Sequence, residues 1–130
     1  MTTKGSKRIF QYLTKLALDN EGTKGRFRLA AGIVHKKSLI ATGVNSYKSH
    51  PLMLQFGKNS DSIFLHAEVD AIKNALRLLS VGQLKDCDMY VVRVKRDGSY
   101  GLAKPCEGCR NAIALYGLKN VYYTHDGCVL

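Results

Sequence analysis

The chain has 130 residues, 45% of them hydrophobic, which is the size of one domain built around a single core. No apolar run approaches the ~18 residues that a membrane-spanning helix needs, and the N-terminal stretch MTTKGSKRIF lacks the apolar segment of a secretion signal. We therefore expect one soluble, cytoplasmic domain that does not enter membranes. The net charge of +10 favours anionic partners such as nucleotides or nucleic acid.

The first predicted element is an amphipathic helix over Ser6–Asn20, with Ser6 as its cap. Next, Arg26–Asn45 contains two β-rich runs separated by a pair of lysines, which predicts a hairpin. Residues 46–61 have the composition of a loop.

A second helix is expected after that loop, capped by Ser60 or Asp61. Its apolar face is formed by Leu65, Val69, Ile72, Leu76 and Leu79. Its opening turn nevertheless carries His66 and Glu68, two polar side chains among apolar neighbours. This arrangement needs a chemical explanation.

The C-terminal half contains a buried strand over Met89–Val94, a short helix from Cys106 to about Gly117, and another strand at residues 121–124. The element order is helix, two strands, helix, strand, helix, strand, and a final strand is conceivable after residue 125. This order predicts one α/β sandwich.

Four cysteines are present, and an intracellular chain keeps them reduced, which favours metal binding or packing over disulfides. Cys106 and Cys109 are three residues apart, so both sulfurs can face one ion at the start of the predicted helix that begins at Cys106. The positive end of that helix favours the thiolate form, which binds metal. Cys87 and Cys128 are expected to be buried as small apolar residues.

If His66 converges on Cys106 and Cys109, one imidazole and two thiolates hold a zinc ion and leave its fourth position open to water, as in catalytic sites. Glu68 could then stand beside that water without binding the metal. The pattern reads His66-Ala67-Glu68 and Pro105-Cys106-Glu107-Gly108-Cys109. H-x-E followed by P-C-x-x-C is the signature of zinc-dependent base deaminases.

With these motifs the chain resembles the cytidine and deoxycytidylate deaminase superfamily, from about Arg26 to Thr124. The resemblance implies a three-layer cytidine-deaminase-like sandwich, with a mixed sheet of about five strands and helices on both faces. It also implies zinc as the cofactor, held by His66, Cys106 and Cys109. Glu68 would act as proton shuttle.

The resemblance further implies that the backbone around Ala67 contacts the base and that Asn45, after the second strand, holds the sugar or the base. Lys48, His50 and Lys104 could meet a phosphate. Asparagine at a strand end is also a common turn residue, and His50 could equally be an ordinary loop residue. Taken alone, the two cysteines could also form a redox pair or simply pack.

The function that follows is hydrolytic deamination of a cytosine nucleotide or nucleoside, with deoxycytidylate favoured, by an enzyme that we expect to be a homo-oligomer. A single phosphate needs few cations, and the chain has no long basic run or aromatic stripe of the kind that tracks single strands. The charge of +10 supports an alternative, a deaminase of cytosine or adenine in single-stranded DNA or tRNA. A non-catalytic, zinc-stabilised module that binds nucleic acid is a third possibility.

Overall fold

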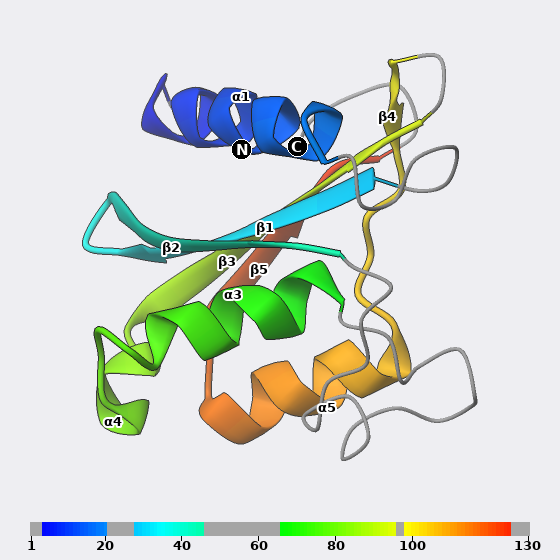
Figure 1. The fold of residues 1–130 in the computed structure, drawn as a ribbon. Coiled ribbons are helices and arrows are strands. Elements are labelled where there is room, and N and C mark those ends of the chain that lie inside the picture. The colour runs from blue at the N-terminus through cyan, green and yellow to red at the C-terminus, as the bar shows by residue number, and fades with distance from the viewer. Residues whose placement is uncertain (1–3, 21–27, 46–65, 96–97, 126–130) are drawn as a thin grey trace.

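A mixed sheet lies between one helix on one face and the remaining helices on the other (Figure 1). The computed structural model describes residues 4–20, 28–45, 66–95 and 98–125. Its strands are β1 (Arg28–His35), β2 (Ser38–Val44), β3 (Cys87–Val94), β4 (Tyr100–Gly101) and β5 (Asn120–Tyr123). Its helices are α1 (Lys4–Leu18), α3 (Ala67–Ala75), α4 (Val81–Leu84) and α5 (Glu107–Tyr116). The expected three-layer α/β sandwich with about five strands is confirmed.

The sheet runs β2-β1-β3, and both β4 and β5 pair with β3. Only the β3–β5 pair is parallel among the described strands. The predicted hairpin joins β1 and β2 through Lys36 and Lys37, whose φ angles are 50° and 68°. Positive φ at both central residues is the geometry whose twist suits a two-residue hairpin.

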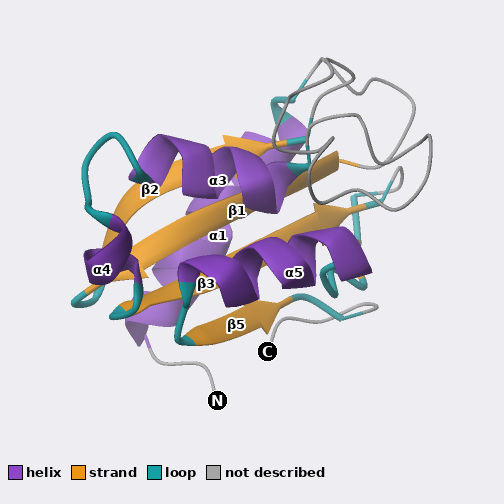
Figure 2. Cartoon of the chain, turned by 90° about the horizontal axis from the view of Figure 1, so that it is seen from below, coloured by secondary structure: helices purple, strands orange, loops and turns teal. Residues whose placement is uncertain are grey.

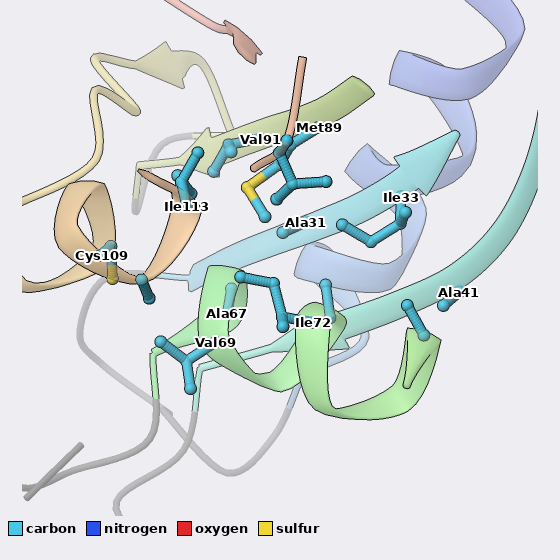
Figure 3. Packing of buried hydrophobic residues seen from close by; sticks show 14 of the residues in the cluster. Ala31, Ile33, Ala41, Ala67, Val69, Ile72, Met89, Val91, Cys109 and Ile113 are labelled. Carbon is cyan, nitrogen blue, oxygen red and sulfur yellow. The ribbon is translucent and has the colours of Figure 1, made fainter. Parts of the chain in front are cut away.

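Two apolar cores fill the spaces on either side of the sheet. Alternate residues of β3 face opposite cores, because successive side chains of a strand point to opposite faces. Met89 and Val91 pack with α3 and α5 (Figure 3), whereas Tyr90 and Val92 pack against α1. This explains why the sequence of β3 is almost continuously apolar. Cys87, at the start of the strand, is buried as expected.

Several predicted boundaries were wrong. Helix α1 starts at Lys4, so Ser6 lies inside it rather than capping it. Helix α3 begins at Ala67 with His66 as its N-cap, so neither Ser60 nor Asp61 caps it. It ends at Ala75, earlier than the apolar spacing suggested, although Leu76 and Leu79 still pack on the core beyond the helix.

Two short elements were not predicted. Helix α4 has four residues and is closed by a capping box between Ser80 and Gln83, a pattern that is legible in the sequence. Strand β4 has two residues, too few for any periodicity. No helix in the described ranges is long and apolar enough to cross a bilayer. The predicted loop at 46–61 and Cys128 lie outside the described residues.

Candidate metal centre and active site

The N-termini of α3 and α5 bring His66, Cys106 and Cys109 together. The two helices lie side by side on the same face of the sheet (Figure 2). His66 Nδ1 lies 3.2 Å from Cys109 Sγ and 3.5 Å from Cys106 Sγ, and the three ligand atoms all lie within 4.8 Å of one another. A nitrogen and a sulfur bound to one tetrahedral zinc are about 3.6 Å apart. The donor set and its spacing therefore fit zinc.

Local backbone geometry explains how each ligand reaches this point. His66 and Cys106 are both N-cap residues with extended backbone, at φ −88° and −69°. The His66 side chain makes no capping hydrogen bond, because its ring is directed to the cysteines instead. Cys106 Sγ accepts a hydrogen bond from the backbone N–H of Cys109 at 3.5 Å. One sulfur thus caps α5 and also faces the histidine.

The electrostatics of the cluster favour one thiolate. A hydrogen bond from Cys109, aided by His66, lowers the pKa of Cys106 to about 3. The same pairing with Cys106, together with burial, raises the pKa of Cys109. The hydrogen bond to Cys106 also raises the pKa of His66. A bound cation would replace the proton that the two sulfurs share, since metal binding and proton release are linked.

Glu68 lies in the first turn of α3, two residues after His66, and is only 4% exposed. Burial is the largest influence on this carboxyl group and raises its pKa. Isolated charges are costly away from water, so a buried carboxyl group calls for a specific chemical reason. Its place beside the cluster suits a group that accepts and returns a proton.

A pocket of about 410 Å³ opens on this cluster, a size within the usual range for small-molecule sites. It is lined by Leu29, Asn45, His66, Ala67, Glu68, Arg93, Leu102, Ala103, Lys104 and Cys106. Apolar walls, one amide and two cationic side chains thus surround the candidate metal ligands and the buried carboxyl group. Such a pocket can hold a planar base together with an anionic group.

Asn45 reaches the pocket from the end of β2. Its side-chain oxygen accepts hydrogen bonds from the backbone N–H of Leu29 at 2.9 Å and from Asn20 Nδ2 at 3.1 Å. The backbone carbonyl of Asn45 accepts a further bond from Asn20 Nδ2 at 2.9 Å. These hydrogen bonds hold Asn45 in place against Leu29 of β1 and against Asn20.

The other predicted site residues divide into two groups. Ala67 and Lys104 line the pocket with Asn45. Lys48 and His50 lie outside the described residues, so their expected part in phosphate binding stays a prediction.

Arg93 also lines the pocket, although the sequence analysis did not predict it as a site residue. Its position as a single arginine within the apolar run of β3 could have indicated a functional role. Its backbone N–H bonds Thr124 Oγ1 at 3.2 Å, and that hydroxyl donates to the carbonyl of Gly101 at 2.7 Å. Thr124, fully buried, thereby ties together the strand ends on this side of the pocket.

The family model for the cytidine and deoxycytidylate deaminase zinc-binding region matches residues 4–125. The chain belongs to this family, and its cofactor is zinc, for which His66, Cys106 and Cys109 form a suitable group. No curated protein sequence matches the chain significantly.

Solved structures with a similar fold include guanine deaminase from Bacillus subtilis, with 27% identity and a TM-score of 0.58 over 92% of this chain and 63% of that one. Another is a dCMP deaminase from the cyanophage S-TIM5 in complex with dCMP and dUMP (19% identity, TM-score 0.61, 95% and 82% of the two chains). A third comes from a study of A-to-I editing by tRNA:A34 deaminases (22% identity, TM-score 0.54, 90% and 75%). The chain thus spans less than two thirds of the guanine deaminase, and the last two likenesses establish the shared fold.

Proposed function

We propose that this protein is a zinc-dependent hydrolytic deaminase that converts a cytosine nucleotide or nucleoside, with deoxycytidylate favoured, into the uracil product and ammonia. The observation that carries the proposal is the buried carboxyl group of Glu68 in the same pocket as His66 and Cys106. A zinc ion that only stabilised the fold would need no buried acid beside it. Membership of a deaminase family supports the same reaction.

In this proposal each residue has a defined part. Zinc held by His66, Cys106 and Cys109 would supply an activated water, since the metal lowers the pKa of a bound water toward ~7. Glu68 takes a proton from the attacking water, passes it to N3 of the cytosine ring, and then assists the departure of the amino group. The overall change is addition of water at C4 and release of ammonia. Asn45 contacts the sugar or the base.

The two cations of the pocket favour a nucleotide over a free base. Lys104 is exposed at the rim, and Arg93 lies along Gly101, where a β-carbon would meet the arginine side chain at 3.1 Å. A single phosphate could pair with both, since charge-assisted hydrogen bonds to phosphate are strong. The complex of the cyanophage dCMP deaminase with dCMP and dUMP supports this choice of substrate.

A polynucleotide substrate is the second candidate, favoured by the net charge of +10 and by the likeness to tRNA:A34 deaminases. The two candidates differ in salt dependence. Binding through several phosphates weakens steeply as salt rises, whereas a single phosphate contact gives a shallow slope.

The test is a substrate panel with purified, zinc-loaded protein. It contains cytidine, deoxycytidine, their monophosphates, adenosine, guanine, single-stranded DNA and tRNA, each scored by ammonia release and mass change at two salt concentrations. We expect the highest kcat/KM with deoxycytidylate and a loss of activity in Glu68→Gln. Deamination confined to polymers would reject the free nucleotide, and deamination of guanine alone would reject cytosine. Absence of activity on every member of the panel would reject the deaminase and favour the non-catalytic module that binds nucleic acid.

Two further parts of the proposal concern the cellular context. We expect a cytoplasmic enzyme that assembles as a homo-oligomer. Cell fractionation and light scattering of the purified protein test these points.

A further inference from the structure

Two polar side chains of helix α3, one helical turn apart, form hydrogen bonds to backbone groups on the outer edge of β2. Asp70 Oδ2 accepts a hydrogen bond from the backbone N–H of Val44 at 3.0 Å. Asn74 Nδ2 donates to the backbone carbonyl of Thr42 at 2.7 Å. The helix runs along this strand (Figure 1).

The spacing of the two bonds follows from regular geometry. Residues four apart lie on one face of a helix. Residues two apart on a strand are equivalent positions of the ladder and turn their polar backbone groups to the same side. Among the described strands β2 pairs with β1 alone, so Asp70 and Asn74 serve edge groups that have no partner strand. Covered edges of this kind are protected from pairing with other chains.

Helix α3 and strand β2 are closely packed at Gly43. A β-carbon at Gly43 would lie 2.6 Å from the carbonyl oxygen of Ala67, so the strand and helix backbones touch directly between the two bonds. Asp70 is 9% exposed, and its second oxygen pairs with Lys73 Nζ at 2.9 Å. The side chain of Lys73 is more exposed, at 30%.

The hydrogen bond between Asp70 and Val44 connects two segments that contribute side chains to the pocket. Asp70 follows Glu68 by two residues on α3, and Val44 immediately precedes Asn45 at the end of β2. The Asp70–Val44 bond is thus a direct link between the element that carries the buried carboxyl group and the element that carries the amide. The side chains of Glu68 and Asn45 line the same pocket.

We propose that Asp70 is a positioning residue, which sets the place of Asn45 relative to Glu68 by accepting the Val44 N–H, with Asn74 as a secondary contact. This inference rests on the proposed function. Small displacements of a contact to the substrate can reduce the rate by up to about 10²-fold, so the effect should be visible in kinetics even if the fold is retained.

The variants separate the hydrogen bond from the ion pair. Asp70→Ala removes the acceptor, Asp70→Asn keeps an acceptor of the same shape, and Lys73→Gln removes only the ion pair. We expect Asp70→Ala to lower kcat/KM for deoxycytidylate about 10- to 10²-fold, mainly by raising KM, with zinc still bound at about one per chain. Asp70→Asn and Lys73→Gln should stay within about threefold of the wild type.

A double-mutant cycle with Asn45→Ala tests the route of the effect, because residues that act as a unit are not additive. On the Asn45→Ala background, Asp70→Ala should reduce kcat/KM by no more than about twofold. A full, additive loss would overturn the proposal, as would an Asp70→Asn variant as impaired as Asp70→Ala. If Asp70→Ala does not fold, Asn74→Ala gives a milder loss that should show the same non-additivity.

Amide hydrogen exchange provides a readout that needs no turnover. Exchange of the Val44 N–H should accelerate at least about tenfold in Asp70→Ala relative to Lys73→Gln, because its acceptor is gone. The Asn45 N–H, which bonds the carbonyl of Leu29 at 3.3 Å, should also lose protection. If the wild type deaminated no cytosine compound, the proposed function would fail. Unchanged exchange at both amides would by itself reject Asp70 as the residue that holds this strand end.

Discussion

Gly43→Ala is expected to be one of the most damaging single-methyl changes in the described part of the chain. The new β-carbon would lie 2.6 Å from the Ala67 carbonyl oxygen and 2.7 Å from the Asp70 carbonyl carbon, and closer still to the Ala71 nitrogen. These are backbone atoms, so no side-chain rotation relieves the contact. Restoring a normal separation of about 3.5 Å from the Ala67 oxygen alone requires β2 and α3 to move apart by about 0.9 Å, and the closer Ala71 nitrogen requires a larger movement.

The loss of stability combines two effects. Overpacking costs about 1–3 kcal/mol. The displacement also weakens the hydrogen bonds that Asp70 and Asn74 make to β2, each contributing about 1 kcal/mol. We therefore expect the free energy of unfolding to fall by about 4 kcal/mol and Tm to fall by about 15 °C in a chain of this size. The measurement is urea unfolding followed by circular dichroism at a fixed zinc concentration.

Two other glycines serve as matched controls. A β-carbon at Gly82, in α4, would have its nearest neighbour, Ser80 Oγ, at 3.9 Å, so Gly82→Ala should be neutral or stabilising by up to about 1 kcal/mol. At Gly32 the closest atom is Leu39 Cδ1 at 2.6 Å, a side-chain end that can move, so we expect an intermediate loss of about 1–2 kcal/mol. Equal losses at all three sites, or a Gly43→Ala protein within 1 kcal/mol of the wild type, would refute the reasoning.

Three further predictions concern the candidate site and its support. Cys106→Ser should lose most of the zinc, about one ion per chain, in metal analysis, whereas Cys87→Ser should retain it; equal zinc in both proteins would reject the ligand set. Glu68→Gln should keep zinc and fold while kcat falls at least ~10²-fold, and near-normal turnover would show that Glu68 moves no proton. Thr124→Val deprives a buried carbonyl and N–H of their partner and should lower the free energy of unfolding by about 2 kcal/mol in urea titrations; an unchanged midpoint would show that this hydroxyl is dispensable.

The features that could be predicted from the sequence are those with a local cause. The apolar period of α1, the β-rich runs of the hairpin and the continuous apolar run of β3 each reflect the environment of their own segment. The motifs around His66 and Cys106 could be recognised in the sequence because ligand spacing within one helical turn is also a local property. The zinc group and the three-layer fold were expected from these patterns together with the family resemblance.

Helix boundaries were less predictable because contacts distant in sequence decide them. His66 occupies the N-cap of α3 with its ring directed to cysteines about 40 residues away, and nothing near residue 60 indicates that the helix starts so late. Arg93 lines the pocket because β3 pairs with β1, where it lies opposite Leu29. Thr124 supports this region because β5, which precedes it, pairs in parallel with β3.

The link between Asp70 and Val44 is likewise a product of tertiary structure. In the sequence Asp70 is one more polar residue on an amphipathic helix, and Gly43 one more glycine in a strand. Only the close packing of α3 on the edge of β2 makes the first a hydrogen-bond acceptor for the strand and the second a position where a side chain does not fit. The sequence alone determined which chemical groups are available, because ligand and acid–base chemistry depends on residue type and short spacing. Tertiary structure decided how far apart they lie, because packing between distant segments determines those distances.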